Sequence, residues 1–141
     1  MFKGFLTSAA CVSALIAGTA QAQDDPYDIY LSMSYIGNDW QAEAANMVKA
    51  LAASNDYSDK VKLQVQVAGP NAQRQIQQVN AMVQAGADAI VIYPISPTAL
   101  NNVVKSACER GVIVIAYDGE ITEPCAYNVT IDQAEAGRIT A

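Results

Sequence analysis

Five side chains that follow apolar segments of this 141-residue sequence have the chemistry needed to bind a hydroxylated small molecule. An ionised aspartate accepts hydrogen bonds from two hydroxyl groups, and charge-assisted bonds of this kind contribute roughly 1.5–3 kcal/mol each when buried. Amide side chains both donate and accept hydrogen bonds, and aromatic rings offer flat apolar faces to the C–H groups of a sugar. The candidate ligand-binding residues are Asn38, Trp40, Gln41, Tyr93 and Asp118.

Most of these candidates also have a purely structural explanation. Trp40 could pack inward at the start of a helix, and Tyr93 could close the core of the domain. Asn38 or Asp39 could serve only as a helix cap, because short polar side chains at that position accept a hydrogen bond from the first helical turn. For these residues the sequence leaves both readings open.

Asp118 has the weakest structural explanation. It follows the apolar run Val112–Tyr117 and precedes Gly119, so the two residues could form a plain turn. Gly119 already breaks the strand, however, and the turn does not need a carboxylate as well. The position therefore favours ligand binding for Asp118.

Enzymatic catalysis finds little support in the sequence. There is no histidine, so a histidine-based triad is impossible within this chain, and no nucleophile elbow or phosphate-binding glycine loop is present. Asp118, Glu120 and Glu123 lack the spacing of a calcium-binding loop. A carboxylate pair of Asp39 and Asp118 rests on nothing beyond their predicted shared edge. We therefore expect a binding protein and no enzyme, with no cofactor and no bound metal.

Apolar strands alternate with amphipathic helices along the chain, which predicts an α/β fold with a parallel sheet. The second helix should end at Gly86 and the third at Gly111, with Ser96 capping the third and Pro97 in its first turn. Asp132 is placed to cap a final helix. The expected strands are 29–34, 61–68, 89–93, 112–117 and 127–131, and the expected first helix is 40–54.

The polarity of the two faces of each strand predicts its place in a doubly wound, Rossmann-like sheet. Strands 89–93 and 112–117 are apolar on both faces and belong in the covered centre, whereas strand 61–68 has a polar face that suits an edge. Right-handed crossovers then give the strand order 2-1-3-4-5. Ligands bind such sheets at the carboxyl ends of the strands where the order reverses, which is where the five candidates fall.

The first residues have the pattern of a secretory signal peptide. Met1–Gly4 carries one positive charge, 5–17 is apolar or small, and Ala20–Ala22 has the small residues that precede a cleavage site. The apolar run is shorter than the roughly 18–20 residues of a membrane-spanning helix. We expect a signal peptide over residues 1–22, a periplasmic location, and a mature α/β lobe over 23–141.

Charge and cysteine content fit this compartment. The formal net charge of −6 leaves no basic surface to follow phosphate groups, so nucleic acid is not expected as a partner. Cys108 and Cys125 remain after the predicted cleavage. An even pair in an oxidising compartment favours a disulfide, and the alternative is two buried thiols.

Four motifs in order resemble the type I periplasmic binding proteins, specifically the ribose-binding-like solute receptors of sugar importers. The similarity covers essentially all of the predicted mature region. The motifs are Ser34–Gln41 (SYIGNDWQ), Ala87–Pro94 (ADAIVIYP), Val112–Asp118 (VIVIAYD) and Thr130–Gly137 (TIDQAEAG).

The resemblance implies a pair of α/β lobes hinged around a monosaccharide or related polyol, which close on it and dock on the membrane permease of an ABC importer. It implies a monomer when the protein is full length. Asn38 matches a polar contact of the family, Trp40 a ring-stacking position and Gln41 the next ring contact. Tyr93 matches a binding position after the third strand, and Asp118 the carboxylate that accepts sugar hydroxyls.

The sequence departs from the ribose receptors in several places. Gly119 stands where they carry an arginine, Gln41 replaces an aromatic residue, and they lack the Cys108 and Cys125 pair. The family is also longer, so we expect 23–141 to be most of a first lobe, truncated, with weak or absent ligand binding on its own and an uncovered sheet edge and apolar surface. Alternative functions are a periplasmic sugar or autoinducer receptor for a chemoreceptor or sensor kinase, and an exported enzyme with catalytic residues elsewhere.

Overall fold

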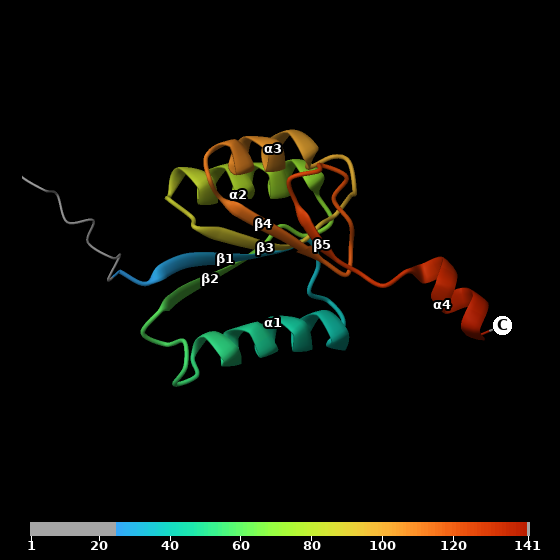
Figure 1. The fold of residues 1–141 in the computed structure, drawn as a ribbon, viewed down its shortest axis with the longest axis horizontal. Coiled ribbons are helices and arrows are strands. Elements are labelled where there is room, and N and C mark those ends of the chain that lie inside the picture. The colour runs from blue at the N-terminus through green and yellow to red at the C-terminus, as the bar shows by residue number, and fades with distance from the viewer. Residues whose placement is uncertain (1–24, 141) are drawn as a thin grey trace, which may run out of the picture.

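The computed structural model describes residues 25–140, so the predicted signal peptide over 1–22 lies outside the described residues. Within this part, strands and helices alternate as the sequence predicts up to β4, and β5 then follows β4 without a helix between them (Figure 1). No helix in the described range is long and apolar enough to cross a membrane. The elements are β1 (Tyr27–Met33), α1 (Asp39–Ala52), β2 (Val61–Val67), α2 (Ala72–Gln84), β3 (Ala89–Tyr93), α3 (Asn101–Glu109), β4 (Ile113–Tyr117), β5 (Tyr127–Val129) and α4 (Gln133–Thr140).

The five strands form one parallel sheet in the order β2-β1-β3-β4-β5. This confirms the predicted doubly wound α/β fold and its strand order. The strand with the polar face, β2, lies at an edge, and its Lys62 and Gln64 are exposed. The strand order reverses between β1 and β3, so the carboxyl ends of these strands border the position where such folds bind ligands.

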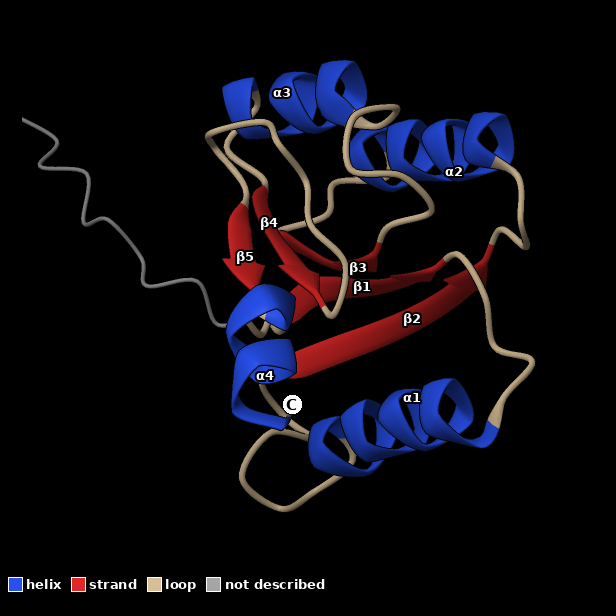
Figure 2. Ribbon diagram, turned by 90° about the vertical axis from the view of Figure 1, so that its right-hand side faces the viewer, coloured by secondary structure: helices blue, strands red, loops and turns tan. Residues whose placement is uncertain are grey.

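Helices cover the two faces of the sheet unequally (Figure 2). The covered face is the side on which α2 and α3 lie, and it contains a continuous core that includes Tyr30, Ile90 and Val114. The open face is the opposite side, on which α1 packs over β1 and β2 and buries Leu31 and Met33. Side chains alternate along a strand, so neighbouring residues such as Tyr30 and Leu31 belong to different faces.

No helix in the described part of the chain packs on the open face over β4 and β5. Ile113 is 51% exposed and Val129 is 64% exposed, because α1 reaches only the other half of this face and α4 has no buried residue (Figure 1). The expectation that strand 112–117 is covered on both faces is therefore wrong for its first residue on this side. An apolar side chain shows that a position can be buried, and a packing helix decides whether it is.

Helix α3 begins later than the sequence predicts. The expected start near Pro97 is replaced by a turn over 97–100, and the helix starts at Asn101. The carbonyl of Pro97 accepts hydrogen bonds from the backbone and the hydroxyl of Thr122, at 2.9 and 3.2 Å, and is not used for a helical bond. The prediction that Ser96 caps this helix is therefore wrong: the N-cap of α3 is Leu100, which makes no side-chain cap bond. Ser96 instead accepts weak bonds in the preceding turn, from the backbone N–H groups of Thr98 and Ala99 at 3.4 and 3.3 Å.

The loop between β4 and β5 is fastened at two places. The Asn128 side chain accepts from the Ile121 N–H and donates to the Ile121 carbonyl, both at 2.9 Å, while the Ile121 side chain is buried. Cys125 forms a disulfide with Cys108 of α3, and both residues pack against the core of the covered face. The loop that carries Asp118 is thus tied to the sheet and to α3.

Candidate functional site

The candidate site lies at the carboxyl edge of the sheet, where the start of α1 meets the ends of β4 and β5. Trp40 and Asp118 line the same open hollow of about 340 Å³, together with Tyr117 and Val129. Asp118 also lines an adjacent hollow of about 640 Å³ at the ends of β4 and β5 and the start of α4. The predicted convergence of a carboxylate and an indole is therefore present in the structure.

Asp118 takes an unusual backbone conformation at the tip of β4. Its φ is 61°, in the left-handed region that costs most non-glycine residues roughly 1–2 kcal/mol and that aspartate tolerates better than most. Its N–H bonds to the Val129 carbonyl at 3.1 Å, and the Gly119 N–H bonds to the Tyr117 carbonyl at 2.7 Å. The chain turns sharply and leaves the Asp118 side chain exposed at the hollow.

Gly119 has a different role from the one expected. The sequence reading made Gly119 the residue that breaks the strand, but Asp118 is the residue with positive φ. At Gly119 the limit is space, because a Cβ there would lie 3.0 Å from Cγ of Pro94. The tips of β3 and β4 therefore approach each other closely, and no side chain stands beside Asp118 at this position.

The tip of β3 is held by Gln75, a residue that sequence reasoning missed. Gln75 of α2 is fully buried, and its Nε2 donates to the carbonyl of Tyr93 at 2.9 Å. Its Oε1 accepts from the Ile95 N–H at 3.0 Å. These bonds fix the segment that contains Pro94. A polar residue within the apolar periodicity of α2 was the signal that could have revealed this role.

Gln41 lies directly against Asp118. It is 2% exposed, and its Nε2 donates to Oδ2 of Asp118 at 3.4 Å, while its Oε1 has no partner among the described residues. The bond helps to orient the carboxylate. The structure thus brings Gln41 to the site as predicted in position, but as a buried support and not as an open ring contact.

Asn38 caps α1 in the structure. Its Oδ1 accepts from the Gln41 N–H at 2.8 Å, which satisfies one of the unpaired donors at the helix start. The capping explanation therefore applies to its oxygen, and Asn38, although exposed, lines neither hollow. By setting the first turn of α1, Asn38 also places Trp40 and Gln41.

Trp40 does not pack inward. It is 55% exposed on the first turn of α1 and presents its indole to the hollow beside Asp118. An exposed indole next to a carboxylate suits a ligand with an apolar face and hydroxyl edges. Of the two sequence readings for Trp40, inward packing is excluded.

Tyr93 and Tyr117 form an aromatic pair on the open face. Their ring centroids are 5.8 Å apart and inclined at 37°. Tyr93 packs against the core of this face and lines neither hollow, whereas Tyr117 lines the hollow with Trp40. The Tyr117 hydroxyl donates to Sδ of Met33 at 2.9 Å.

Tyr117 was missed by sequence reasoning although it directly precedes Asp118. Burial, then the charge of Asp118, then Tyr93 raise the pKa of Tyr117 to about 12. Its phenol therefore stays protonated, and remains a hydrogen-bond donor, at alkaline pH values where an ordinary tyrosine ionises. The signal for this residue was its place on the same strand face as Tyr93 in the neighbouring strand.

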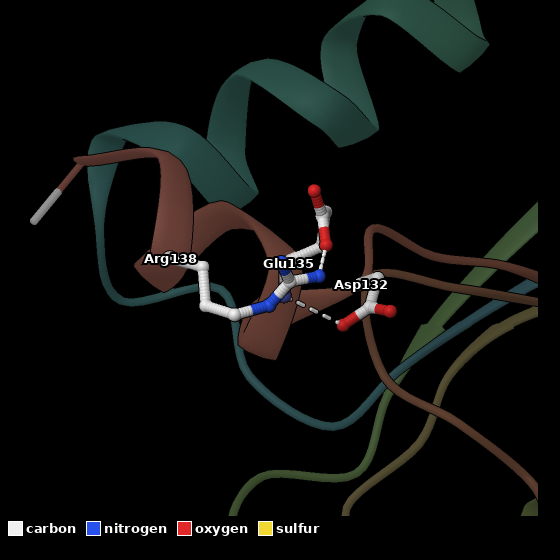
Figure 3. A network of polar contacts seen from close by, with 3 residues as sticks. All are labelled: Asp132, Glu135 and Arg138. Carbon is white, nitrogen blue, oxygen red and sulfur yellow. Dashed lines mark hydrogen bonds and ion pairs between the residues drawn. The ribbon is translucent and has the colours of Figure 1, made fainter.

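The second hollow is bordered by the start of α4. Asp132 caps this helix as predicted, with its Oδ1 accepting from the Glu135 N–H at 2.9 Å, and Arg138 forms an ion pair with Glu135 (Figure 3). Among the described residues no cluster of histidine, cysteine, aspartate or glutamate is arranged to hold a metal ion. The residues lining this hollow are Asp118, Glu120, Thr130, Ile131, Asp132 and Gln133.

Sugar-binding periplasmic proteins are similar to this chain in sequence. A multiple sugar-binding periplasmic protein of Azospirillum brasilense is 31% identical over 145 residues, which cover 97% of this chain and 39% of that protein. A D-xylose-binding periplasmic protein of Escherichia coli (strain K12) is 35% identical over 81 residues, 57% of this chain and 24% of that protein. This chain thus spans about two fifths or less of these relatives.

Solved structures share its fold. An ABC transporter solute binding protein from Thermobispora bispora matches with a TM-score of 0.65 and 31% identity, over 82% of this chain and 37% of that one. A Caulobacter myo-inositol binding protein matches in fold with a TM-score of 0.71 and 24% identity, over 80% of this chain and 38% of that one. Residues 29–141 match the periplasmic binding protein domain. The chain therefore belongs to the periplasmic binding protein family.

Proposed function

We propose that this chain is part of a periplasmic solute-binding protein that captures a monosaccharide or related polyol and delivers it to the membrane permease of an ABC importer. One observation carries the proposal: an exposed Trp40 and the Asp118 carboxylate line one hollow at the carboxyl edge of the sheet. Two relatives are named as D-xylose-binding and multiple sugar-binding periplasmic proteins, and these names support the same ligand class.

The residues of the hollow fit a polyol in complementary ways. Ligand hydroxyls donate to the Asp118 carboxylate, which Gln41 holds from its buried side. The C–H face of the ring packs on the indole of Trp40, and the Tyr117 side chain borders the same hollow. The longer protein then closes a second lobe over the ligand, which shifts the population from open to closed.

The single tryptophan of the chain provides a direct test. Because Trp40 is the only tryptophan in the sequence and lines the hollow, its fluorescence reports ligand binding there. We expect a saturable change when the 141-residue chain is titrated with D-xylose, D-glucose or myo-inositol. One lobe supplies only part of a clamp, so the expected dissociation constants are in the millimolar range or weaker, roughly 4 kcal/mol of binding free energy.

A matched pair of variants completes the test. Asp118→Asn should weaken binding about tenfold or more, because charge-assisted hydrogen bonds become neutral ones. Asp59→Asn removes an exposed carboxylate from the turn between α1 and β2 and should leave binding unchanged. If no polyol changes the fluorescence of the wild-type chain up to its solubility limit, the hollow with Trp40 and Asp118 does not bind a polyol in this chain, and the observation that carries the proposal is lost.

The periplasmic location has its own test. A chain expressed with its leader and recovered from the periplasm is expected to begin at Gln23, which mass spectrometry measures. Recovery of an uncleaved chain from the cytoplasm alone would contradict the proposed location.

A further inference from the structure

The two hollows at the candidate site carry acidic side chains and no basic ones. Asp118, Glu120 and Asp132 line them, and no lysine or arginine among the described residues does. Arg138 of α4, which follows Asp132 in the sequence, is paired with Glu135. The other lysines and arginines of the described part lie in the last turn of α1, the turn before β2, β2 itself, the first turn of α2, and α3 and its end: Lys49, Lys60, Lys62, Arg74, Lys105 and Arg110.

The local packing keeps a cation away from Asp118. Gly119 follows Asp118, and any side chain at this position would begin 3.0 Å from Cγ of Pro94. Gln75 holds the segment with Pro94 in place through its bonds to Tyr93 and Ile95. Within residues 25–140, the Gln41 amide is the single side-chain partner of this carboxylate.

Gln41 leaves a buried acceptor next to Asp118 without a hydrogen-bond donor from the described part of the chain. Its side chain is 2% exposed, its Nε2 is given to Asp118, and its Oε1 has no hydrogen-bond partner among the described residues. Buried amide oxygens are nearly always paired in folded proteins.

We propose that this site selects its ligand by charge: it rejects anionic sugars and binds an ammonium-bearing polyol more tightly than the hydroxyl counterpart. The inference rests on the proposed function. In the described part of this chain, a carboxylate or phosphate on the ligand would face Asp118, Glu120 and Asp132 with no counter-ion, and juxtaposed like charges oppose binding. An ammonium group donates charge-assisted hydrogen bonds to Asp118 and is attracted to the face of Trp40.

The test compares ligands that differ at one substituent. D-Glucose, D-glucosamine and D-glucuronate form one series, and D-galactose, D-galactosamine and D-galacturonate form a second. Trp40 fluorescence of the 141-residue chain gives each dissociation constant at about pH 6.5, where amines are protonated and ordinary carboxyl groups are ionised. Titrations at low and high salt show whether the differences shrink by screening.

We expect the uronates to bind at least about tenfold more weakly than the neutral sugars, and the amino sugar of at least one series to bind severalfold more tightly. Uronates that bind as well as the neutral sugars, or amino sugars that bind no tighter in both series, overturn the inference. If neutral sugars bind while the charge ranking fails, only this inference is lost. If no sugar in either series binds, the polyol site at this hollow fails together with the inference.

Asp118→Asn tests the origin of the ranking. Asparagine also tolerates positive φ, so the turn should be retained. In this variant the ratio of the glucosamine affinity to the glucose affinity should fall toward one, whereas Asp59→Asn should leave the ratio unchanged. A ratio unaffected by Asp118→Asn would show that the preference does not come from this carboxylate.

Discussion

The two faces of the sheet differ in how completely they are packed. On the covered face, Ile90 is 0% exposed beneath α2 and α3, whereas on the open face Ile113 of the neighbouring strand is 51% exposed. Two helices cover the first side and α1 alone covers part of the second (Figure 2). The core of the covered face therefore supplies most of the burial, and hence most of the hydrophobic stabilisation.

The candidate site belongs to the less packed side. Trp40 comes from α1, and Tyr117 points to the open face next to Tyr93. Binding residues are often placed in the less stable parts of a fold, because a ligand must reach them. The covered face thus contributes most of the fold's stability, and the candidate site lies at the edge of the open face. Substitutions on the two faces should therefore have different effects.

The largest expected difference lies between two isoleucines. Ile90→Ala should lower the free energy of unfolding by about 2–5 kcal/mol, because it leaves a cavity in the covered core. Ile113→Ala, on the open face, should cost about 1 kcal/mol or less. Urea unfolding measures both. Equal losses in the two variants would remove the distinction between the faces.

The disulfide should provide the next largest effect, and it acts on the covered face. Cys108 and Cys125 are separated by 17 positions, and closing a loop of this size stabilises a fold by about 3 kcal/mol, mainly by restricting the unfolded chain. The Cys108→Ala/Cys125→Ala double variant, or the reduced protein, should therefore unfold at lower urea. An unchanged midpoint after reduction would mean that the bridge does not contribute.

Helix caps give a smaller and sharper comparison. Asn38 caps α1 and Asn71 caps α2, with Oδ1 accepting at 2.8 and 2.9 Å. Substituting either by alanine should lower the free energy of unfolding by about 1 kcal/mol. Only Asn38→Ala should also weaken polyol binding, because α1 carries Trp40 and Gln41. Equal effects of both variants on fluorescence titrations would detach the site from the start of α1.

The last comparison concerns the pH dependence of the open face, which changes only in alkaline solution. The pKa of Tyr117 is raised to about 12 by burial, by the Asp118 charge and by Tyr93, and its ordinary value is 10.0. Between these values the folded chain keeps a proton that the unfolded chain loses, so the stabilisation is complete below pH 10 and is lost as the pH rises toward 12.

Tyr117→Phe should accordingly make the free energy of unfolding fall less steeply in this window, as urea titrations at several pH values would measure. Asp118→Asn should lower the pKa of Tyr117 and give an intermediate slope, because one of its causes is removed. A slope that is the same in the wild type and in Tyr117→Phe would contradict this account.

Much of the fold could be predicted because its signals are local. Alternating residues in 61–68 indicated an edge strand, and the continuous apolar run 89–93 indicated a central one. The handedness of crossovers then fixed the strand order. The start of α3 was not predictable in this way, since the carbonyl of Pro97 is bonded by Thr122, which lies 25 residues away.

The candidate site was predictable in location and less so in detail. The ends of parallel strands indicated where Asp118 and Trp40 would meet, and they do line one hollow. Whether Gln41 faces the ligand or supports Asp118 depends on distances between elements that no local pattern contains. The same holds for Gln75, whose partners lie on two strands and a loop.

The hydrogen bonds and the disulfide that hold the β4–β5 loop have a kinetic consequence. The Asn128 side chain accepts from the N–H and donates to the carbonyl of Ile121, and Cys125 is bonded to Cys108 of α3. The segment after Asp118 is therefore already ordered when a ligand arrives. Encounter with this lobe then requires no slow ordering of the loop. Ligands of different affinity are therefore expected to arrive at similar rates and to differ in how long they stay.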